Sequence, residues 1–299
     1  MKKKIAVIGL GSMGLGMAQS LVRAGFEVSG YDTAPERAEA LCRLGGKAAD
    51  TPALAATGAT LVVVVVVNAT QTEDALFGND GVVSALDRGG VVVSCATMAP
   101  EAARALAART EAEGRSYIDA PMSGGAARAA DGELTFLASG PEVAFEIARP
   151  ALDAMAGRIC ELGPEPGTAA AFKMINQLLA GVHIAAACEA VAFAARQKLD
   201  LEKVYEVITS AAGNSWMFEN RVPHILAGDY TPLSAVNIFV KDLGIVQDVA
   251  RSSAFPVPLA AAALQMFAAA SGMGMGGDDD SSVARIYAML SGVTLPAAS

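Results

Sequence analysis

The chain has few of the side chains that build metal sites or disulfide frameworks. It contains four cysteines and two histidines among 299 residues, and it has no CxxC pair. A disulfide-stabilised secreted domain needs densely spaced cysteines, and a zinc site needs closely spaced thiolate or imidazole ligands. We therefore expect reduced thiols that pack in the interior, and no bound metal.

Basic residues and long apolar runs are also scarce. Lys and Arg total 22 against 31 Asp and Glu, so the formal net charge is −9, which disfavours nucleic acid and anionic membranes as partners. The longest purely apolar run, Leu61–Val67, is far shorter than the roughly 20 residues that span a bilayer. Near the N-terminus, Gly9, Gly11 and Gly14 interrupt the stretch in which a signal peptide would be apolar. We expect a cytoplasmic protein that acts on a small molecule.

Short apolar runs alternate with Ala-rich helical stretches through the first half of the chain. Strands that alternate with helices predict βαβ units and a parallel sheet, and strands that are apolar on both faces predict helices on both sides of it. We expect residues 1–163 to form an α/β, Rossmann-like, doubly wound domain. The runs are Ile5–Ile8, Glu27–Tyr31, Leu61–Val67, Val91–Ser94, Ser116–Ile118 and Leu134–Ala138.

The pattern changes after the Gly- and Pro-rich segment Gly163–Gly167. From Thr168 to Gln197 there is no Pro, and Ala, Leu and Ile dominate, which predicts one long helix of about 45 Å. The remainder lacks β-branched runs, so we expect residues 164–299 to hold this interdomain helix and an all-helical domain. We expect a loop at Gly272–Ser282. The alternating carboxylates of a calcium loop are missing, so we expect the tract Gly276–Asp280 to be solvated, with an Asp or Ser capping the next helix.

A glycine-rich turn follows the first expected strand. Gly9–Gly14 has the spacing GxGxxG and precedes a helical stretch, which is the context in which backbone N–H groups bind a pyrophosphate. Asp32 ends the second expected strand, where a carboxylate accepts from ribose hydroxyls and repels a 2′-phosphate. Together they predict dinucleotide binding with NAD favoured over NADP. A purely structural turn is the alternative, and Arg37 is the feature that favours NADP.

The segment Asp119–Gly125 directly follows another expected strand. The hydroxyl of Ser123 and the uncovered backbone N–H groups at Gly124 and Gly125 are suited to bind a carboxylate. An ordinary turn and helix cap is the alternative.

Three polar residues share one face of the long helix, because Lys173, Asn176 and Gln177 are spaced i, i+3 and i+4. Apolar neighbours imply that this face is buried, and burial lowers the pKa of a lysine and makes its amine available as a general base. A lysine whose amine extends to the surface is the alternative. The segment Lys241–Leu243 is by itself a common surface pattern.

In this order and spacing, the segments Gly9–Gly14, Asp119–Gly125, Gly167–Gln177 and Lys241–Leu243 resemble the motifs of the β-hydroxyacid dehydrogenase family over nearly the whole chain. The resemblance implies a Rossmann-like domain, a long connecting helix and a helical domain that forms a homodimer or homotetramer. It implies Lys173 as catalytic residue, with Asn176 orienting the substrate. It also implies substrate binding at Ser123, Gly124, Gly125, Gln177 and Trp216, and NAD binding at Gly9, Leu10, Gly11, Ser12, Met13, Gly14, Asp32, Asn68, Thr97 and Lys241.

The chain also departs from the common pattern of this family. Asn68 stands where a Leu-Pro pair is usual, and Ala169 replaces the second Gly of the lysine motif. The segments Val66–Asn68, Ala212–Arg221 and Asn237–Asp242 resemble those of family members that act on L-threonate. We expect NAD-dependent oxidation of a short sugar acid, L-threonate at its 2-hydroxyl. The alternatives are a tartronate semialdehyde reductase, a 3-hydroxyisobutyrate dehydrogenase and a non-catalytic NAD-binding module. Trp216 either lines the substrate site or anchors helices in the core.

Overall fold

A computed structural model describes residues 3–297 of the chain. It divides into two compact units, Met1–Lys173 and Met174–Ser299, whose boundary falls inside the long helix α9, Thr168–Arg196. That helix has the expected start and ends one residue before the expected end.

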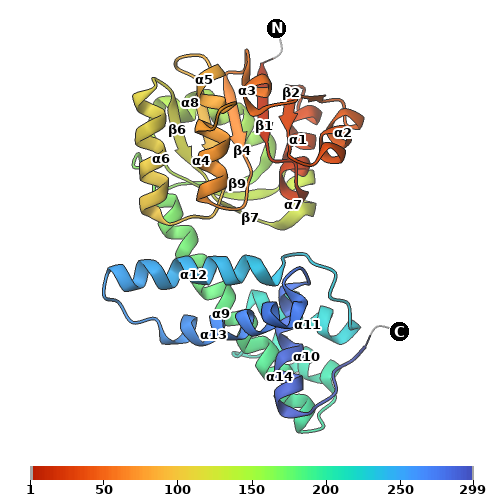
Figure 1. Cartoon of the computed structure of the whole chain (residues 1–299). Coiled ribbons are helices and arrows are strands. Elements are labelled where there is room, and N and C mark those ends of the chain that lie inside the picture. The colour runs from red at the N-terminus through yellow and green to blue at the C-terminus, as the bar shows by residue number, and fades with distance from the viewer. Residues whose placement is uncertain (1–2, 298–299) are drawn as a thin grey trace. The chain divides into compact units, whose positions relative to one another are not determined.

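The first unit contains a six-stranded sheet in which every pair of neighbouring strands is parallel. The strand order is β3-β2-β1-β4-β5-β6. The chain adds strands outwards from β1 to β3 and then from β4 to β6 on the other side, so the topological switch point lies between β1 and β4, as in doubly wound dinucleotide-binding folds. Figure 1 shows these strands at the centre of the unit with helices around them. The strands are β1 Lys4–Ile8, β2 Glu27–Tyr31, β3 Lys47–Ala48, β4 Leu61–Val64, β5 Val91–Ser94 and β6 Ser116–Asp119.

The sheet is buried on both faces. Successive residues of a strand point to opposite sides, and accordingly Ile5 and Val7 of β1 belong to one core cluster while Ala6 and Ile8 belong to another. This confirms the expected doubly wound architecture. The helices of this unit are α1 Ser12–Arg23, α2 Pro35–Arg43, α3 Pro52–Ala56, α4 Ala69–Phe77, α5 Val82–Ala85, α6 Pro100–Ala112, α7 Gly125–Asp131 and α8 Glu142–Met155.

Two of the expected strands differ from the structure. The run Leu61–Val67 leaves the sheet after Val64, because Val67 already belongs to the turn that starts α4 and its backbone N–H donates to the side chain of Gln71. Leu134–Ala138 forms β8 of a separate three-stranded sheet, between antiparallel β7, Met122–Ser123, and parallel β9, Ala156–Glu161.

The second unit is built from helices throughout its described residues, as expected. Its core gathers around Ile184, Cys188 and Val191 of α9. Two helices, Thr168–Arg196 and Pro258–Met275, are long and apolar enough to cross a membrane by length and composition, and the same test is passed by core helices of soluble proteins. The stretch Pro258–Met275 comprises α13 Pro258–Ala270 and η1 Ser271–Met275. The remaining helices are α10 Leu201–Thr209, α11 Trp216–Ala227, α12 Val236–Ser252, η2 Asp280–Ser282 and α14 Val283–Ser291.

The expectation that the tract Gly276–Asp280 is solvated is wrong, whereas the expected cap is confirmed, because Oδ1 of Asp279 accepts from the backbone N–H of Ser281 at the start of η2. Asp279 and Asp280 are fully buried, and the guanidinium of Arg221 binds both carboxylate oxygens of Asp280, with Nη2 3.0 Å from Oδ2. Burial raises the pKa of Asp280 to about 6, although the bonds from Arg221 lower it. The buried pair ties the tract to α11.

All four cysteines are free thiols, as expected. Cys95 and Cys188 are buried, and burial raises the pKa of both thiols strongly. Cys42 is exposed.

Candidate functional site

The glycine-rich turn has no room for side chains at two of its glycines. Gly9 has φ of +90°, and a Cβ there would lie 2.2 Å from the carbonyl oxygen of Val65, beyond the end of β4. A Cβ on Gly14 would lie 1.9 Å from the carbonyl oxygen of Gly9, so the helix packs directly on the turn. At Gly11 the space is open, and no side chain caps the first turn of α1. The turn therefore leaves helix N–H groups exposed where a pyrophosphate fits.

Asp32 follows β2 and is held beside this turn. Its Oδ2 accepts from the backbone N–H of Leu10 at 2.7 Å, and its Oδ1 accepts from Ala34 at 2.9 Å. Arg37 pairs with the same carboxylate at 3.3 Å, with about half of the arginine side chain exposed. The carboxylate is thereby fixed where a ribose is expected, with one half-exposed cation next to it.

Two other expected cofactor residues follow β4 and β5. Parallel strands end at one edge of their sheet, so Asn68 and Thr97 lie at the same edge as the glycine-rich turn. Asn68 is the N-cap of α4, and its Oδ1 accepts from the backbone N–H of Gln71 at 2.9 Å. The cap leaves the amide nitrogen as a donor and the second lone pair of the oxygen as an acceptor for a ligand.

The expected carboxylate-binding residues lie where β7 ends at Ser123 and α7 begins at Gly125. Ser123, Gly124 and Gly125 all reach the surface. Gly124 has φ of +142° and Gly125 has φ of +80°, conformations that a residue with a Cβ rarely adopts. The serine hydroxyl and the glycine backbone are accessible to a small acid.

Asp119, at the end of β6, is a residue whose role the sequence did not indicate. It is fully buried, and its Oδ2 accepts from the backbone N–H groups of Gly167 at 3.0 Å and Ala170 at 2.8 Å. Burial raises the pKa of this carboxyl to about 6, while the two N–H groups and the charge of Arg104 oppose the rise. The carboxylate therefore binds the start of the helix that carries Lys173.

Two of the three polar residues on the expected buried face of α9 are buried, and the third is exposed. Lys173 and Gln177 are each 7% exposed. Asn176 is exposed, as are the apolar side chains of Phe172 and Ile175, so the flanking apolar residues do not all mark buried positions. The helix buries the two polar residues spaced i, i+4 and leaves several apolar ones at the surface.

A hydrogen-bonded chain connects α9 and α12 within the second unit. The amide nitrogen of Asn176 donates to Oε1 of Gln177 at 2.9 Å, and Nε2 of Gln177 donates to Oδ2 of Asp242. Nζ of Lys241 donates to Oδ1 of the same carboxylate. Asp242, which is 2% exposed, thus accepts from both Gln177 and Lys241 and joins these two expected site residues in one network.

The polar residues before Trp216 also have local roles. Ser215 is the N-cap of α11, and the amide nitrogen of Asn214 donates to Thr209 and Glu219. Trp216 itself is 63% exposed, so it does not anchor the core of this unit.

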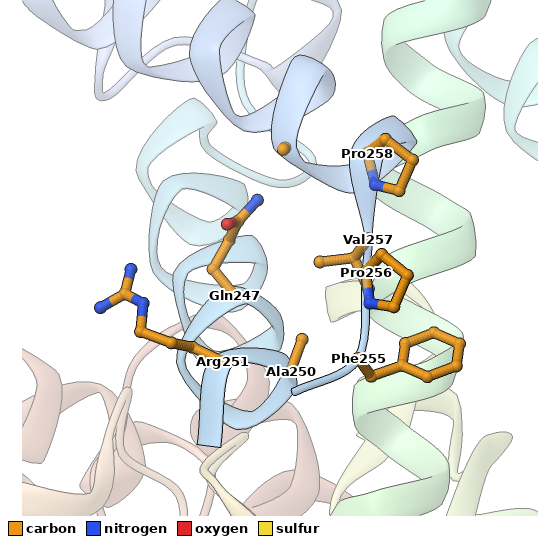
Figure 2. A pocket seen from close by; sticks show the side chains of 8 residues that line it. Gln247, Ala250, Arg251, Phe255, Pro256, Val257 and Pro258 are labelled. Atoms are coloured by element: carbon orange, nitrogen blue, oxygen red, sulfur yellow. The ribbon is translucent and has the colours of Figure 1, made fainter. Parts of the chain in front are cut away.

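Two cavities lie in the second unit. One, of about 850 Å³, lies along α9, α10 and α11 and is lined mainly by Ala, Val, Leu and Phe side chains, with Asn214 and Ser215 at its margin. The other, of about 350 Å³, lies at the turn between α12 and α13, where Figure 2 shows Arg251, Phe255 and Pro256 around it. Neither is lined by Lys173, Asn176 or Lys241.

Residues 3–297 contain no group of three or more His, Cys, Asp or Glu side chains that could hold a metal ion.

Family models match most of the chain. Residues 4–163 match the model of the NAD binding domain of 6-phosphogluconate dehydrogenase. Residues 167–287 match the model described as NAD-binding of NADP-dependent 3-hydroxyisobutyrate dehydrogenase.

Curated proteins and solved structures also resemble the chain along its full length. It is 53% identical to the L-threonate dehydrogenase of Cupriavidus necator, over 99% of both chains. It is 48% identical to the L-threonate dehydrogenase of Escherichia coli, over 98% of this chain and 97% of that one. A crystal structure titled 3-hydroxyisobutyrate dehydrogenase from Salmonella typhimurium has 47% identity and a TM-score of 0.89, over 95% of this chain and 100% of that one.

Proposed function

Since the chain belongs to the β-hydroxyacid dehydrogenase family, we propose that it oxidises L-threonate at C2 to the 2-oxo acid, 2-dehydro-L-erythronate. As a member of this family it is an NAD-dependent oxidoreductase that acts on a CH–OH group. The observation that carries the choice of substrate is the similarity, at 48% identity or more over 98% of the chain or more, to several L-threonate dehydrogenases.

The residues present fit a dinucleotide. The turn at Gly9–Gly14 excludes side chains at Gly9 and Gly14 and leaves Gly11 open, and the carboxylate of Asp32 is fixed beside it. Backbone N–H groups of the turn bind the pyrophosphate, and Asp32 binds the ribose hydroxyls. When bound, NAD supplies the hydride acceptor.

The loop Ser123–Gly125 binds the carboxylate of the substrate through the serine hydroxyl and backbone N–H groups. The carbinol carbon next to this carboxylate is then presented to Lys173, whose amine takes the proton of the 2-hydroxyl as the hydride leaves the same carbon. Asn176 orients the substrate. Binding of the carboxylate and deprotonation of the adjacent carbinol fix the geometry of the reacting groups, and such positioning can supply a large part of the rate enhancement.

Two rival substrates remain inside the family, 3-hydroxyisobutyrate and tartronate semialdehyde. L-Threonate carries extra hydroxyls that form hydrogen bonds with polar groups of a substrate site. 3-Hydroxyisobutyrate carries a methyl group instead, so the same polar groups of the site are left without a hydrogen-bond partner. A missing hydroxyl in a site built to bind it costs about 10²-fold or more in kcat/KM. A non-catalytic NAD-binding module would turn over none of these acids.

The test is NADH formation by the purified protein with a panel of C3 to C6 hydroxy acids at subsaturating concentration, followed by identification of the product. We expect L-threonate to exceed 3-hydroxyisobutyrate in kcat/KM by about 10²-fold or more. Equal efficiency with the two acids refutes the choice of substrate and leaves the family assignment standing.

We propose that the chain acts in the cytoplasm as a homodimer or homotetramer, with neither nucleic acid nor membrane as partner. The support for self-association is the large apolar cavity along α9, α10 and α11 and the exposed apolar side chains around it, among them Phe193, Leu199 and Val207. A second copy that covers this surface removes it from water. Light scattering after size-exclusion chromatography measures the mass, and a monomer at micromolar concentration refutes the proposal.

A further inference from the structure

The N-terminus of α9 is buried against the strands of the first unit and needs hydrogen-bond acceptors. The first N–H groups of a helix have no partner inside the helix, and a buried N–H without a partner is costly. Asp119 accepts from Gly167 and Ala170 through one carboxylate oxygen, and Oγ of Ser139 accepts from Ala169 at 3.0 Å. Two buried side chains therefore satisfy three backbone donors at the start of this helix.

The two anchoring residues are themselves joined. The backbone N–H of Asp119 donates to the carbonyl oxygen of Ser139 at 2.9 Å, and the N–H of Ser139 donates back to Asp119 at 2.9 Å. Both side chains are completely buried. The anchor is thus part of the rigid framework of the unit.

Asp119 lies between the two groups that must act together on the substrate. The chain runs from Asp119 directly into the loop Ser123–Gly125, and Lys173 follows Ala170 by one helical turn. A hydrogen bond from Ala170 to Asp119 therefore connects the lysine helix to the residue from which the carboxylate-binding loop departs.

We propose that Asp119 is a positioning residue of the reaction: through the first turn of α9 it fixes the amine of Lys173 relative to the loop that holds the substrate carboxylate. The inference rests on the proposed function, which gives Lys173 and Ser123–Gly125 their roles. Misplacement of a catalytic group by about 1 Å can cost about 10²-fold in rate, so a small movement of this helix start is sufficient.

Burial makes the anchor sensitive to pH, because it raises the pKa of the Asp119 carboxyl. Arg104 of α6 faces it with a positive charge, and the phenol of Tyr117 on β6 and the thiol of Cys95 after β5 lie close enough to interact with it. With a pKa of about 6, the carboxyl is ionised at neutral pH and gains a proton below pH 6, where it accepts more weakly from the helix N–H groups.

The decisive variants are Asp119→Asn, which keeps the shape and removes the charge, and Ser139→Ala, which removes one acceptor. Thr51→Ala is the matched control, because Thr51 caps a different helix of the same unit, α3, through its hydroxyl. We expect Asp119→Asn to lower kcat about 10- to 10²-fold with the KM for NAD within about twofold. Ser139→Ala should lower kcat less, and Thr51→Ala should leave it unchanged.

Two measurements do not depend on turnover. In the protein without substrate, amide hydrogen exchange of the peptide that covers residues 166–173 should be at least about tenfold faster in Asp119→Asn than in Thr51→Ala. Acetylation of Lys173 by acetic anhydride, measured by mass spectrometry, should also be faster in Asp119→Asn than in Thr51→Ala. In the pH profile of kcat, protonation of Lys173 lowers kcat in both proteins, and the further fall that protonation of Asp119 causes near pH 6 should be absent in Asp119→Asn.

The outcomes separate this inference from the proposed function. If the wild-type protein oxidises a different acid, the same variants are compared on that acid, and only the choice of substrate fails. If Asp119→Asn keeps kcat within twofold at neutral pH, the positioning role is overturned even where exchange accelerates. If Asp119→Asn does not fold, Ser139→Ala decides: unchanged kcat overturns the inference, and a lowered kcat with faster exchange of the same peptide supports it.

Discussion

Replacement of Asp32 by Asn should shift the protein from NAD towards NADP. In the wild type, the ionised carboxylate accepts from ribose hydroxyls, a bond to a charged group that is worth about 1.5 to 3 kcal/mol. A 2′-phosphate removes one such hydroxyl and adds a charge of about −1.5 to −2, which a carboxylate about 4 Å away repels by about 1 kcal/mol per unit charge in water.

Arg37 reduces this discrimination, because its guanidinium is 3.3 Å from the same carboxylate and its side chain is about half exposed, so it can turn towards a phosphate. We therefore expect the wild type to prefer NAD by at least about tenfold, which corresponds to about 1.4 kcal/mol. In Asp32→Asn the repulsion is gone, the amide oxygen can still accept from the N–H of Leu10, and Arg37 loses its anionic partner. The ratio of kcat/KM for NAD to that for NADP should fall by about tenfold or more.

The assay is steady-state kinetics with both cofactors at saturating L-threonate. The double variant Asp32→Asn with Arg37→Gln is the control, since it should lose the NADP activity that the single variant gains. An unchanged cofactor ratio in Asp32→Asn, or a gain of NADP activity on removal of Arg37, refutes this account of the two residues.

Three further predictions follow from the structure. Lys173→Ala should lower kcat by about 10²- to 10⁴-fold with NAD affinity nearly unchanged, and retention of more than about 10% of kcat would contradict a general base at this position. A thiol reagent should label Cys42 in the native protein and leave the two buried cysteines intact until it unfolds, as counted by mass spectrometry. Arg221→Leu should lower the free energy of unfolding by about 3 to 5 kcal/mol at pH 7, because it leaves the buried carboxylate of Asp280 without its cation. The loss of unfolding free energy should be smaller at pH 5, where the carboxyl of Asp280, with a pKa of about 6, is protonated. Arg251→Leu is the matched control: it removes the exposed ion pair with Asp248 and should lower the free energy of unfolding by at most about 1 kcal/mol.

The parallel sheet and the cofactor turn could be predicted because their signals are local. Runs such as Val91–Ser94 are apolar at successive positions, which is the pattern of a strand covered on both faces. The strand β9, Ala156–Glu161, was missed because it lies at the edge of the small sheet and none of its residues is buried. An edge strand with exposed side chains carries no periodic apolar signal.

The buried carboxylates were missed for a different reason. Three consecutive aspartates after glycines are typical of a solvated loop, and the basic residue that follows them, Arg285, pairs with Asp278 rather than with Asp280. The partner of Asp280 is Arg221, which is 59 residues away and comes close only when α11 packs against η2. The same holds for Asp119 and Gly167, which are 48 residues apart. Pairings between distant residues depend on the tertiary fold, which the local pattern does not contain.

Polar residues at helix starts show why the substrate is the hardest part to infer. Asn68 and Ser215 have side chains that suit the hydroxyls of a sugar acid, yet each one caps a helix with its side-chain oxygen. Asn and Ser are also the residue types that helix N-caps prefer, so the sequence alone does not separate the two roles. Since capping uses the oxygen of Asn68 and leaves its amide nitrogen, this residue can still donate to a substrate hydroxyl or to the cofactor. Asn68→Asp tests this, because it keeps the cap and removes the donor: a loss of kcat/KM for L-threonate without loss of stability would assign Asn68 to the site, whereas unchanged kinetics would assign it to the helix alone.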